Sequence, residues 1–187
     1  MGMGIRSFYT EAVSKDFSRN FQLRVMDLGN GILTEKDNVY ITTAILPGYA
    51  VTNQTVPFMG LVFNVPGSAT FPGSEGWQVT FRADMNMNIR QKIINWQASI
   101  FSAFPQTPEQ STGNYAPKEY GSTAKLVVID RDGNGVRGIK LIGVWPVNVD
   151  NITYDQTGNG EVVTFPVTLA YQWWEVDNTN MGKILQA

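Results

Sequence analysis

The sequence predicts a mainly β fold: a small antiparallel β-barrel or sandwich with one flanking amphipathic α-helix and a projecting hairpin arm. The first observation is the stretch Lys125–Glu175, where glycine–asparagine turns at 132–135 and 157–160 separate apolar segments. The second is strict alternation in its last segment, which places one set of side chains on one face of a strand: Val163, Phe165, Val167, Leu169, Tyr171 and Trp173.

Three further strands are expected before this stretch. Phe21–Leu28 and Gly76–Asp84 alternate apolar and polar residues, and Asn38–Leu46 is rich in β-branched residues. Pro47-Gly48 ends the strand Asn38–Leu46. Ser7–Asp16 is expected to form a weak, short helix, with Phe8, Ala12 and Val13 on one side.

Residues 49–76 differ from the rest of the chain. They contain three prolines and several glycines, and also the apolar run Val56–Val65. This combination predicts an extended hairpin or arm that projects from the domain, because long excursions with apolar content are usually functional or docked on another surface. An ordinary ordered surface loop is the alternative.

One amphipathic helix is expected at about residues 88–101. Ile89, Ile93, Trp96 and Ile100 recur at helical spacing, and Asn88 with Gln91 resembles a capping box. A single such helix beside many strands covers one mouth or one face of a barrel or sandwich. Phe104–Gly121 is expected to be a loop and 176–187 a tail, with possible docking points at Met181, Ile184 and Leu185.

Adjacent apolar residues on predicted strands point to opposite faces of the sheet. Leu141-Ile142, Val144-Trp145 and Trp173-Trp174 are three such pairs. A sheet with one face in water should not be apolar on both sides. Either a second layer of the same chain or another copy of the chain must therefore cover the second face.

Composition limits the function. The length of 187 residues suits one domain, 1–187, and the net charge of −2 argues against a DNA-gripping surface. Cysteine and histidine are absent, which removes disulfides, thiolate chemistry and the commonest general base and zinc ligand. No signal peptide or membrane span is visible, so we expect a chain of intracellular origin without membrane anchoring.

Two glycine-rich motifs favour turns over binding sites. Gly133–Gly138 matches G-x-G-x-x-G, but a strand-like segment follows where a phosphate-binding helix should begin. Asp130–Asn134 matches the first half of a calcium loop, yet Leu141 stands where the bidentate glutamate belongs. Weak calcium binding at this turn stays open. Because no nucleophile elbow or carboxylate pair is recognisable, we expect no enzyme, no catalytic residue, no cofactor and no metal.

Several blocks, in order over about Phe21–Glu175, resemble the tail tube proteins of contractile-tail bacteriophages. They are Ala44-x-Leu46-Pro47-Gly48, Val56-Pro57-Phe58-Met59-Gly60, the helix Arg90-Gln91-Lys92-x-x-x-Trp96-Gln97, Lys140–Val149 with its Trp145-Pro146-Val147-Asn148-Val149, and the closing Val163–Glu175. The resemblance implies a small β-barrel or sandwich with one helix. It further implies that six copies form a ring, that rings stack into a hollow tube for the genome, and that this tube lies inside a contractile sheath.

The resemblance also implies partners and a location. We expect self-contacts within and between rings, contacts with tail sheath and baseplate or terminator proteins, and phage DNA that passes without specific binding. The protein would reside in the virion tail and assemble in the host cytoplasm. The candidate oligomer-interface residues are Phe58, Met59, Leu61, Phe63, Trp145, Trp173 and Trp174. Alternatives are the tube of a phage-like injection or type VI-like secretion system, or a soluble β-sandwich that binds a ligand or calcium.

Overall fold

The computed structural model describes residues 4–14, 17–104, 107–108, 111, 113, 121–158 and 160–179, and these form a mainly β protein. In chain order the elements are α1 (Ile5–Ser14), β1 (Leu23–Leu28), α2 (Glu35–Asn38), β2 (Ile41–Ala44), β3 (Ala50–Phe58), β4 (Leu61–Thr70), β5 (Trp77–Arg82), α3 (Asn88–Ile100), β6 (Ser122–Ile129), β7 (Gly135–Val149), β8 (Thr164–Ala170) and β9 (Trp173–Val176).

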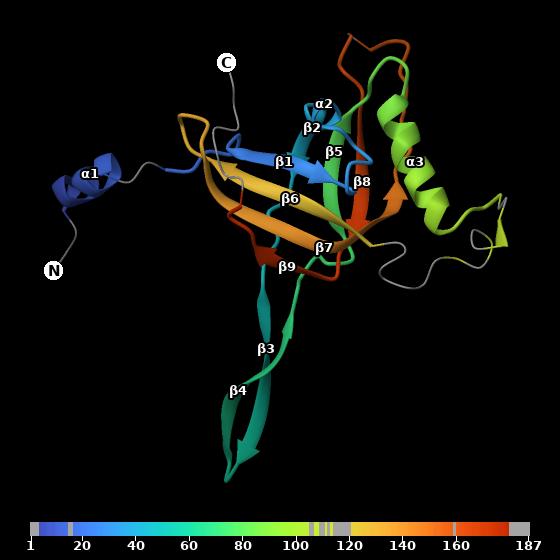
Figure 1. Ribbon diagram of the computed structural model, residues 1–187. Coiled ribbons are helices and arrows are strands. Elements are labelled where there is room, and N and C mark those ends of the chain that lie inside the picture. Colours follow the sequence, from blue (N-terminus) through green and yellow to red (C-terminus); the bar gives the residue numbers. More distant parts are fainter. Residues whose placement is uncertain are drawn as a thin grey trace.

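Two antiparallel layers share strand β7 (Figure 1). Strands β1, β6 and β9 join its first half, whereas β8, β5 and β2 continue the sheet from its second half. Strands β1 and β2 are the two ends of this series, and no pairing joins them in the described part of the chain. The expected barrel is therefore not closed, and the folded sheet is the sandwich form of the prediction.

Strand β7 belongs to both layers, and this explains why its sequence is apolar on both faces. Strand β7 bends at Gly143, whose φ of +69° interrupts the extended backbone. Leu141 before the bend and Val144 after it are both fully buried, although simple alternation would place them on opposite faces. The second layer of the same chain covers these side chains, so much of the two-faced apolarity is satisfied internally.

The closing segment is two strands, not one. The prediction of a continuous strand from Val163 is wrong, because β8 ends at Ala170 and the chain crosses to the other layer as β9. The Gln172 N–H donates to the carbonyl oxygen of Ile142 at 2.9 Å, which fixes the crossing beside the bend of β7. Period-two alternation continues through such a crossing, so the pattern alone does not reveal it.

Replacing Gly143 with alanine should destabilise the fold. A Cβ at this position would lie 2.6 Å from Gln172 Cγ, and the positive φ disfavours any L side chain. We expect a loss of about 1–2 kcal/mol in the free energy of unfolding, measured by urea denaturation. Gly76→Ala is the matched control, because a Cβ at that position would meet no other atom within 4 Å. Equal stability of the two variants would contradict this role of Gly143.

The two predicted glycine turns have different outcomes. The first closes the β6–β7 hairpin, and the Asp130 N–H donates to the carbonyl oxygen of Asn134 at 2.8 Å. The second does not close a tight hairpin, because residues 150–163 separate the paired strands β7 and β8. Residue Asn159 of that turn lies outside the described residues.

Helix α3 lies beside the second half of β7 (Figure 1) and buries Ile89, Ile93 and Trp96, as its periodicity predicted. The predicted cap is wrong. The N-cap is Met87, and the Asp84 carboxylate accepts hydrogen bonds from the N–H groups of Asn88 and Ile89 at 3.0 and 3.2 Å. Asp84 lies outside the S/T-x-x-E pattern, so the local motif does not indicate it.

The chain start and the second strand differ from expectation. Helix α1 begins at Ile5, and its residues are nearly all exposed. The short helix α2, capped by a reciprocal Thr34–Asp37 box, ends at Asn38, the first residue of the expected strand Asn38–Leu46, and strand β2 begins only at Ile41. The docking points Met181, Ile184 and Leu185, and most of the loop after Phe104, lie outside the described residues.

The core lies between the two layers and under α3. Phe81 and Phe165 face each other across β5 and β8 as fully buried, stacked rings 5.6 Å apart. Fully buried aliphatic side chains from both layers surround them, including Val79, Leu126, Leu141, Val167 and Leu169. This core holds the body rigid and leaves the hairpin β3–β4 outside it.

Candidate self-assembly surface

The hairpin β3–β4 projects from the body as an arm (Figure 1). Its strands pair from Ala50↔Thr70 to Phe58↔Leu61, and Met59-Gly60 forms a two-residue turn. Both turn residues have positive φ, 49° and 82°, which is the backbone of a type I′ turn and matches the twist of the strands. The arm is therefore a regular ribbon, as the sequence predicted, and not an irregular loop.

The strand register divides the arm into two faces of different chemistry. Directly paired residues share a face and successive pairs alternate. One face carries only apolar side chains at the tip, Val56, Phe58, Leu61 and Phe63, followed by the pair Gln54 and Val65. The other carries Asn53, Thr55 and Asn64 together with Pro57, Val62 and Pro66. Pro57 and Pro66 both belong to non-hydrogen-bonded pairs of the ribbon. The backbone N–H at such a position points away from the partner strand, so a missing donor costs least there.

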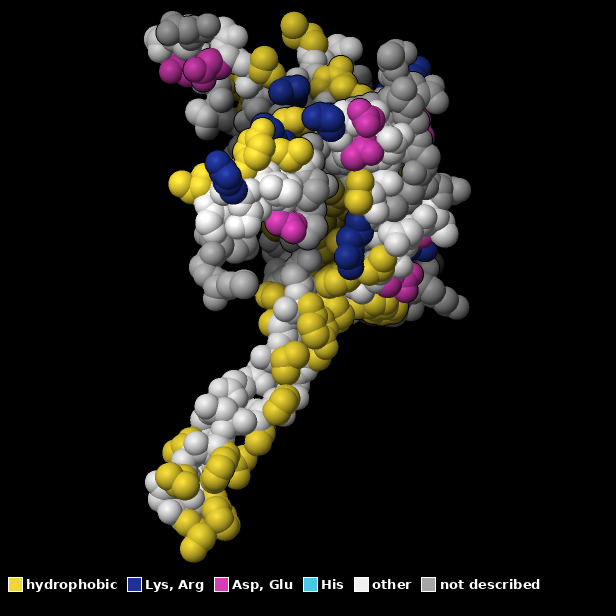
Figure 2. Space-filling view, turned by 90° about the vertical axis from the view of Figure 1, so that its left-hand side faces the viewer, with side chains coloured by type: hydrophobic (Ala, Val, Ile, Leu, Met, Phe, Trp, Pro, Cys, Tyr) yellow, Lys and Arg dark blue, Asp and Glu magenta, His cyan; other side chains and the backbone are white. Residues whose placement is uncertain are grey.

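The apolar face of the arm is open to solvent. Phe58 is 62% exposed, Met59 88% and Leu61 63%. Residues 50–70 contain no charged side chain at all. Figure 2 shows hydrophobic side chains gathered at the tip, away from the charged surface of the body. A contiguous exposed apolar patch of this kind marks an interaction surface.

The structure separates the predicted interface residues into two groups. Phe58, Leu61 and Phe63 lie together on the apolar face, with Met59 at the turn. The three tryptophans lie on the body instead: Trp145 is half-buried on β7, Trp173 is 46% exposed on β9, and Trp174 is half-buried. The interface role of all seven residues stays a prediction.

A second exposed apolar stripe lies on α1. Ile5, Phe8, Tyr9 and Val13 follow helical spacing, and each is more than half exposed. The sequence interpretation placed Phe8, Ala12 and Val13 on one side of this helix and omitted Ile5 and Tyr9. Ile5 was omitted because the expected helix began two residues later, whereas Tyr9 lay inside its bounds and fits the same periodicity.

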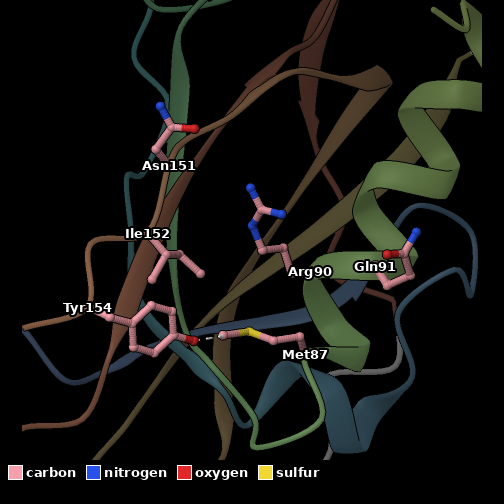
Figure 3. A pocket seen from close by; sticks show the side chains of 6 residues that line it. All are labelled: Met87, Arg90, Gln91, Asn151, Ile152 and Tyr154. Atoms are coloured by element: carbon pink, nitrogen blue, oxygen red, sulfur yellow. Dashed lines mark hydrogen bonds between the residues drawn. The ribbon is translucent and has the colours of Figure 1, made fainter. Parts of the chain in front are cut away.

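One hollow of the described surface lies between the start of α3 and the loop after β7 (Figure 3). It has a volume of about 470 Å³ and is lined by Met87, Arg90, Gln91, Asn151, Ile152 and Tyr154. The Arg90 guanidinium donates from Nη2 to the carbonyl oxygen of Asp150 at 3.5 Å. The lining holds one cation, Arg90, and the hydroxyl of Tyr154, and it contains no carboxylate.

The Asp130 carboxylate is used within its own turn. Oδ1 accepts hydrogen bonds from the N–H groups of Asp132 and Asn134, and Oδ2 accepts one from the Asn134 amide. These bonds, that from the Asn134 side chain foremost, lower the pKa of Asp130. Among the described residues no group of three or more potential metal ligands occurs. The arrangement is that of a hairpin turn stabilised by its first residue.

Asp177, directly after β9, forms an ion pair with Lys125 of β6. Hydrogen bonds from Thr179, and one from Lys125 at 3.2 Å, lower the pKa of Asp177 to about 2. The carboxylate is therefore ionised at neutral pH and pairs with Lys125.

A second ion pair joins α3 to α2, where Lys92 Nζ lies 2.6 Å from the carboxylate of Asp37. Burial works to raise the pKa of Asp37, but the hydrogen bonds from Lys92 and Thr34 lower it. No described helix has the length and apolar character needed to cross a membrane.

Comparison with known proteins identifies the family. The phage tail tube protein family matches residues 11–177. The tail tube protein gp19 of Enterobacteria phage T4 is 34% identical over 165 residues, which cover 87% of this chain and 93% of that protein. Its counterpart from Enterobacteria phage T6 is 33% identical over the same extent.

The fold agrees with solved contractile assemblies. The tube-terminating cap of the anti-feeding prophage superposes with a TM-score of 0.59 at 14% identity, covering 87% of this chain and 92% of that one. A chain of the sheath–tube complex of an extracellular contractile injection system superposes with a TM-score of 0.52 at 10% identity, covering 90% and 96%. By sequence and by fold, this chain belongs to the phage tail tube protein family.

Proposed function

We propose that this chain is a non-enzymatic structural subunit whose copies form rings of six that stack into a hollow tube. The tube would conduct the phage genome through a contractile tail. The observation that carries this proposal is the projecting arm, which leaves an apolar face uncovered in a single molecule. A stable isolated protein would be expected to bury or break up such a surface.

The occupant of the apolar face is a second copy of this chain in the adjacent ring. The arm carries no charge, so burial between rings leaves no ionised group without a partner. It also extends clear of the body, which lets it reach a neighbour along one direction (Figure 2). A head-to-tail contact of this kind does not close on itself and continues as a stack.

The remaining partners follow from the family. The solved relatives include sheath–tube, terminator and baseplate assemblies, which suggests that this subunit also contacts a sheath, a terminator and a baseplate. A net charge of −2 per chain and an uncharged arm support passage of DNA without binding, because basic walls would hold the phosphate backbone. The assembled protein would then be a component of the virion tail.

Leu61 and Val62 offer a matched test of the arm. They are adjacent and equally exposed, at 63% and 64%, but lie on opposite faces. We expect Leu61→Asn to reduce tube formation strongly and Val62→Asn to leave it near the wild-type level. Negative-stain electron microscopy and sedimentation of concentrated protein measure both. Equal effects of the two substitutions would contradict a one-sided contact, and a wild-type protein that never forms rings or tubes would overturn the proposed function.

A further inference from the structure

The direction of the arm must be fixed at its base. In the described part of the chain, β3 and β4 pair only with each other, and residues 51–70 are all exposed. A two-stranded ribbon is at best marginally stable by itself and has no contact along its length to hold its angle. The two points where the chain enters and leaves the ribbon, near Gly48 and Phe71, are therefore the places where its direction can be set.

Trp174 contacts both of these points. Its indole Nε1 donates a hydrogen bond to the carbonyl oxygen of Gly48 at 2.8 Å, which holds the entering segment. Its ring meets Phe71 of the leaving segment edge to face, with ring centres 6.3 Å apart. Phe71 meets Tyr49 in the same way at 5.6 Å, so the three rings join the two legs of the arm.

Other contacts hold one leg each. The Tyr171 N–H donates to the carbonyl oxygen of Ser74 at 2.7 Å, on the leaving side. The Trp77 indole donates to the carbonyl oxygen of Ile45 at 2.7 Å, on the entering side. Each of these bonds anchors one segment to the body. Trp174 contacts both segments, which also meet each other through Tyr49 and Phe71, and it stands on β9, which is paired with β7 of the rigid body.

We propose that Trp174 is the positioning residue of the arm: it locks the direction of β3–β4 relative to the sheet, so that all subunits of a ring present their apolar faces alike. This inference rests on the proposed stacking role of the arm. It gives Trp174 a role within the subunit, where the sequence interpretation placed it at a boundary between subunits. A free arm would lose orientational order when it docks, and that loss would oppose stacking.

Trp173 provides the internal control. It is the same residue type, next in the same strand, and it points to the opposite face, where it is 46% exposed. Any effect of losing an indole from β9 in general should appear at both positions. An effect of the contact with the arm base should appear only at Trp174.

The chain has no cysteine, so spin labels can be placed without further changes. In the full-length protein, Met59→Cys at the tip and Gln78→Cys on β5 provide two exposed labelling sites. Double electron–electron resonance at concentrations below assembly then reports the distribution of distances between arm and body. We expect a narrow distribution in the parent and with Trp173→Ala, and a broad one with Trp174→Ala. Trp174→Phe, which keeps a ring against Phe71 but loses the donor to Gly48, should be intermediate.

The outcomes separate this inference from the proposed function. Two results would overturn the role of Trp174. One is a distance distribution with Trp174→Ala that is as narrow as in the parent, and the other is a distribution that Trp173→Ala broadens as much as Trp174→Ala does. If circular dichroism shows that Trp174→Ala is unfolded, comparison of Trp174→Phe with Trp173→Phe decides in the same way. The distance measurement needs no assembly, so absence of tubes in the parent would count against the stacking function alone.

Discussion

Shortening the arm by four residues on each strand should give a folded protein that no longer stacks into tubes. Deleting Thr55–Phe58 and Leu61–Asn64 joins Gln54 to Met59 and Gly60 to Val65. Gln54 and Val65 are already paired, and removal of an even number preserves which face each side chain occupies. Most of the apolar face is lost, so the contact between rings should be lost with it. Electron microscopy should show single rings or monomers in place of tubes.

The same deletion should hardly change stability. Every removed residue is exposed and none belongs to the core, so the deletion removes no buried contact that stabilises the body. Thermal unfolding followed by circular dichroism checks this and shows that lost assembly is not lost folding. Tubes of ordinary length from the shortened protein would refute the arm as the stacking contact.

Replacing Phe165 with alanine should remove a large part of the stability of the body. Phe165 is fully buried and stacks on Phe81 at the junction of β5 and β8. Truncation of a buried phenylalanine costs about 3–5 kcal/mol, through lost burial and the cavity that remains. That loss is comparable with the lower end of the total stability of a domain, about 5 kcal/mol. Urea denaturation at neutral pH measures the change.

Phe58→Ala is the matched control for that substitution. Phe58 is also an aromatic residue on a strand, but it is 62% exposed on the arm. We expect its free energy of unfolding to stay within about 0.5 kcal/mol of the wild type. The two phenylalanines should thus show opposite behaviour, one supporting the fold and the other supporting assembly. If Phe165→Ala lowers the free energy of unfolding only slightly, the surrounding core must collapse into the cavity, and the expected large effect would be wrong.

Local patterns predicted those parts of the fold that depend on neighbouring residues alone. The helix at 88–101, the turn after Asp130 and the apolar run of the arm follow from periodicity and turn chemistry, and the structure contains all three. The cap of α3 was mispredicted because Asp84 reaches the helix from outside the expected motif. The long connection after Val149 was mispredicted because a glycine–asparagine pair also occurs in loops that close no hairpin.

The candidate self-assembly surface was likewise only partly predictable from the sequence. The arm-tip residues could be proposed from the sequence, because a long apolar excursion with prolines cannot belong to a buried central strand. Their arrangement on one face requires the register, which the Met59-Gly60 turn sets. The contact of Trp174 with Gly48 joins positions 126 residues apart, and no local pattern contains such information.

The class of fold, the family and the presence of an arm could be predicted from the residues alone, because these depend on alternation, turn residues and ordered blocks of similar residues. The division of the apolar residues into core and surface required the three-dimensional structure. Residues on either side of Gly143 have the same hydrophobic pattern, yet the bend of β7 turns both Leu141 and Val144 inward. Burial depends on which layers meet across the core, and that depends on contacts between residues distant in the sequence.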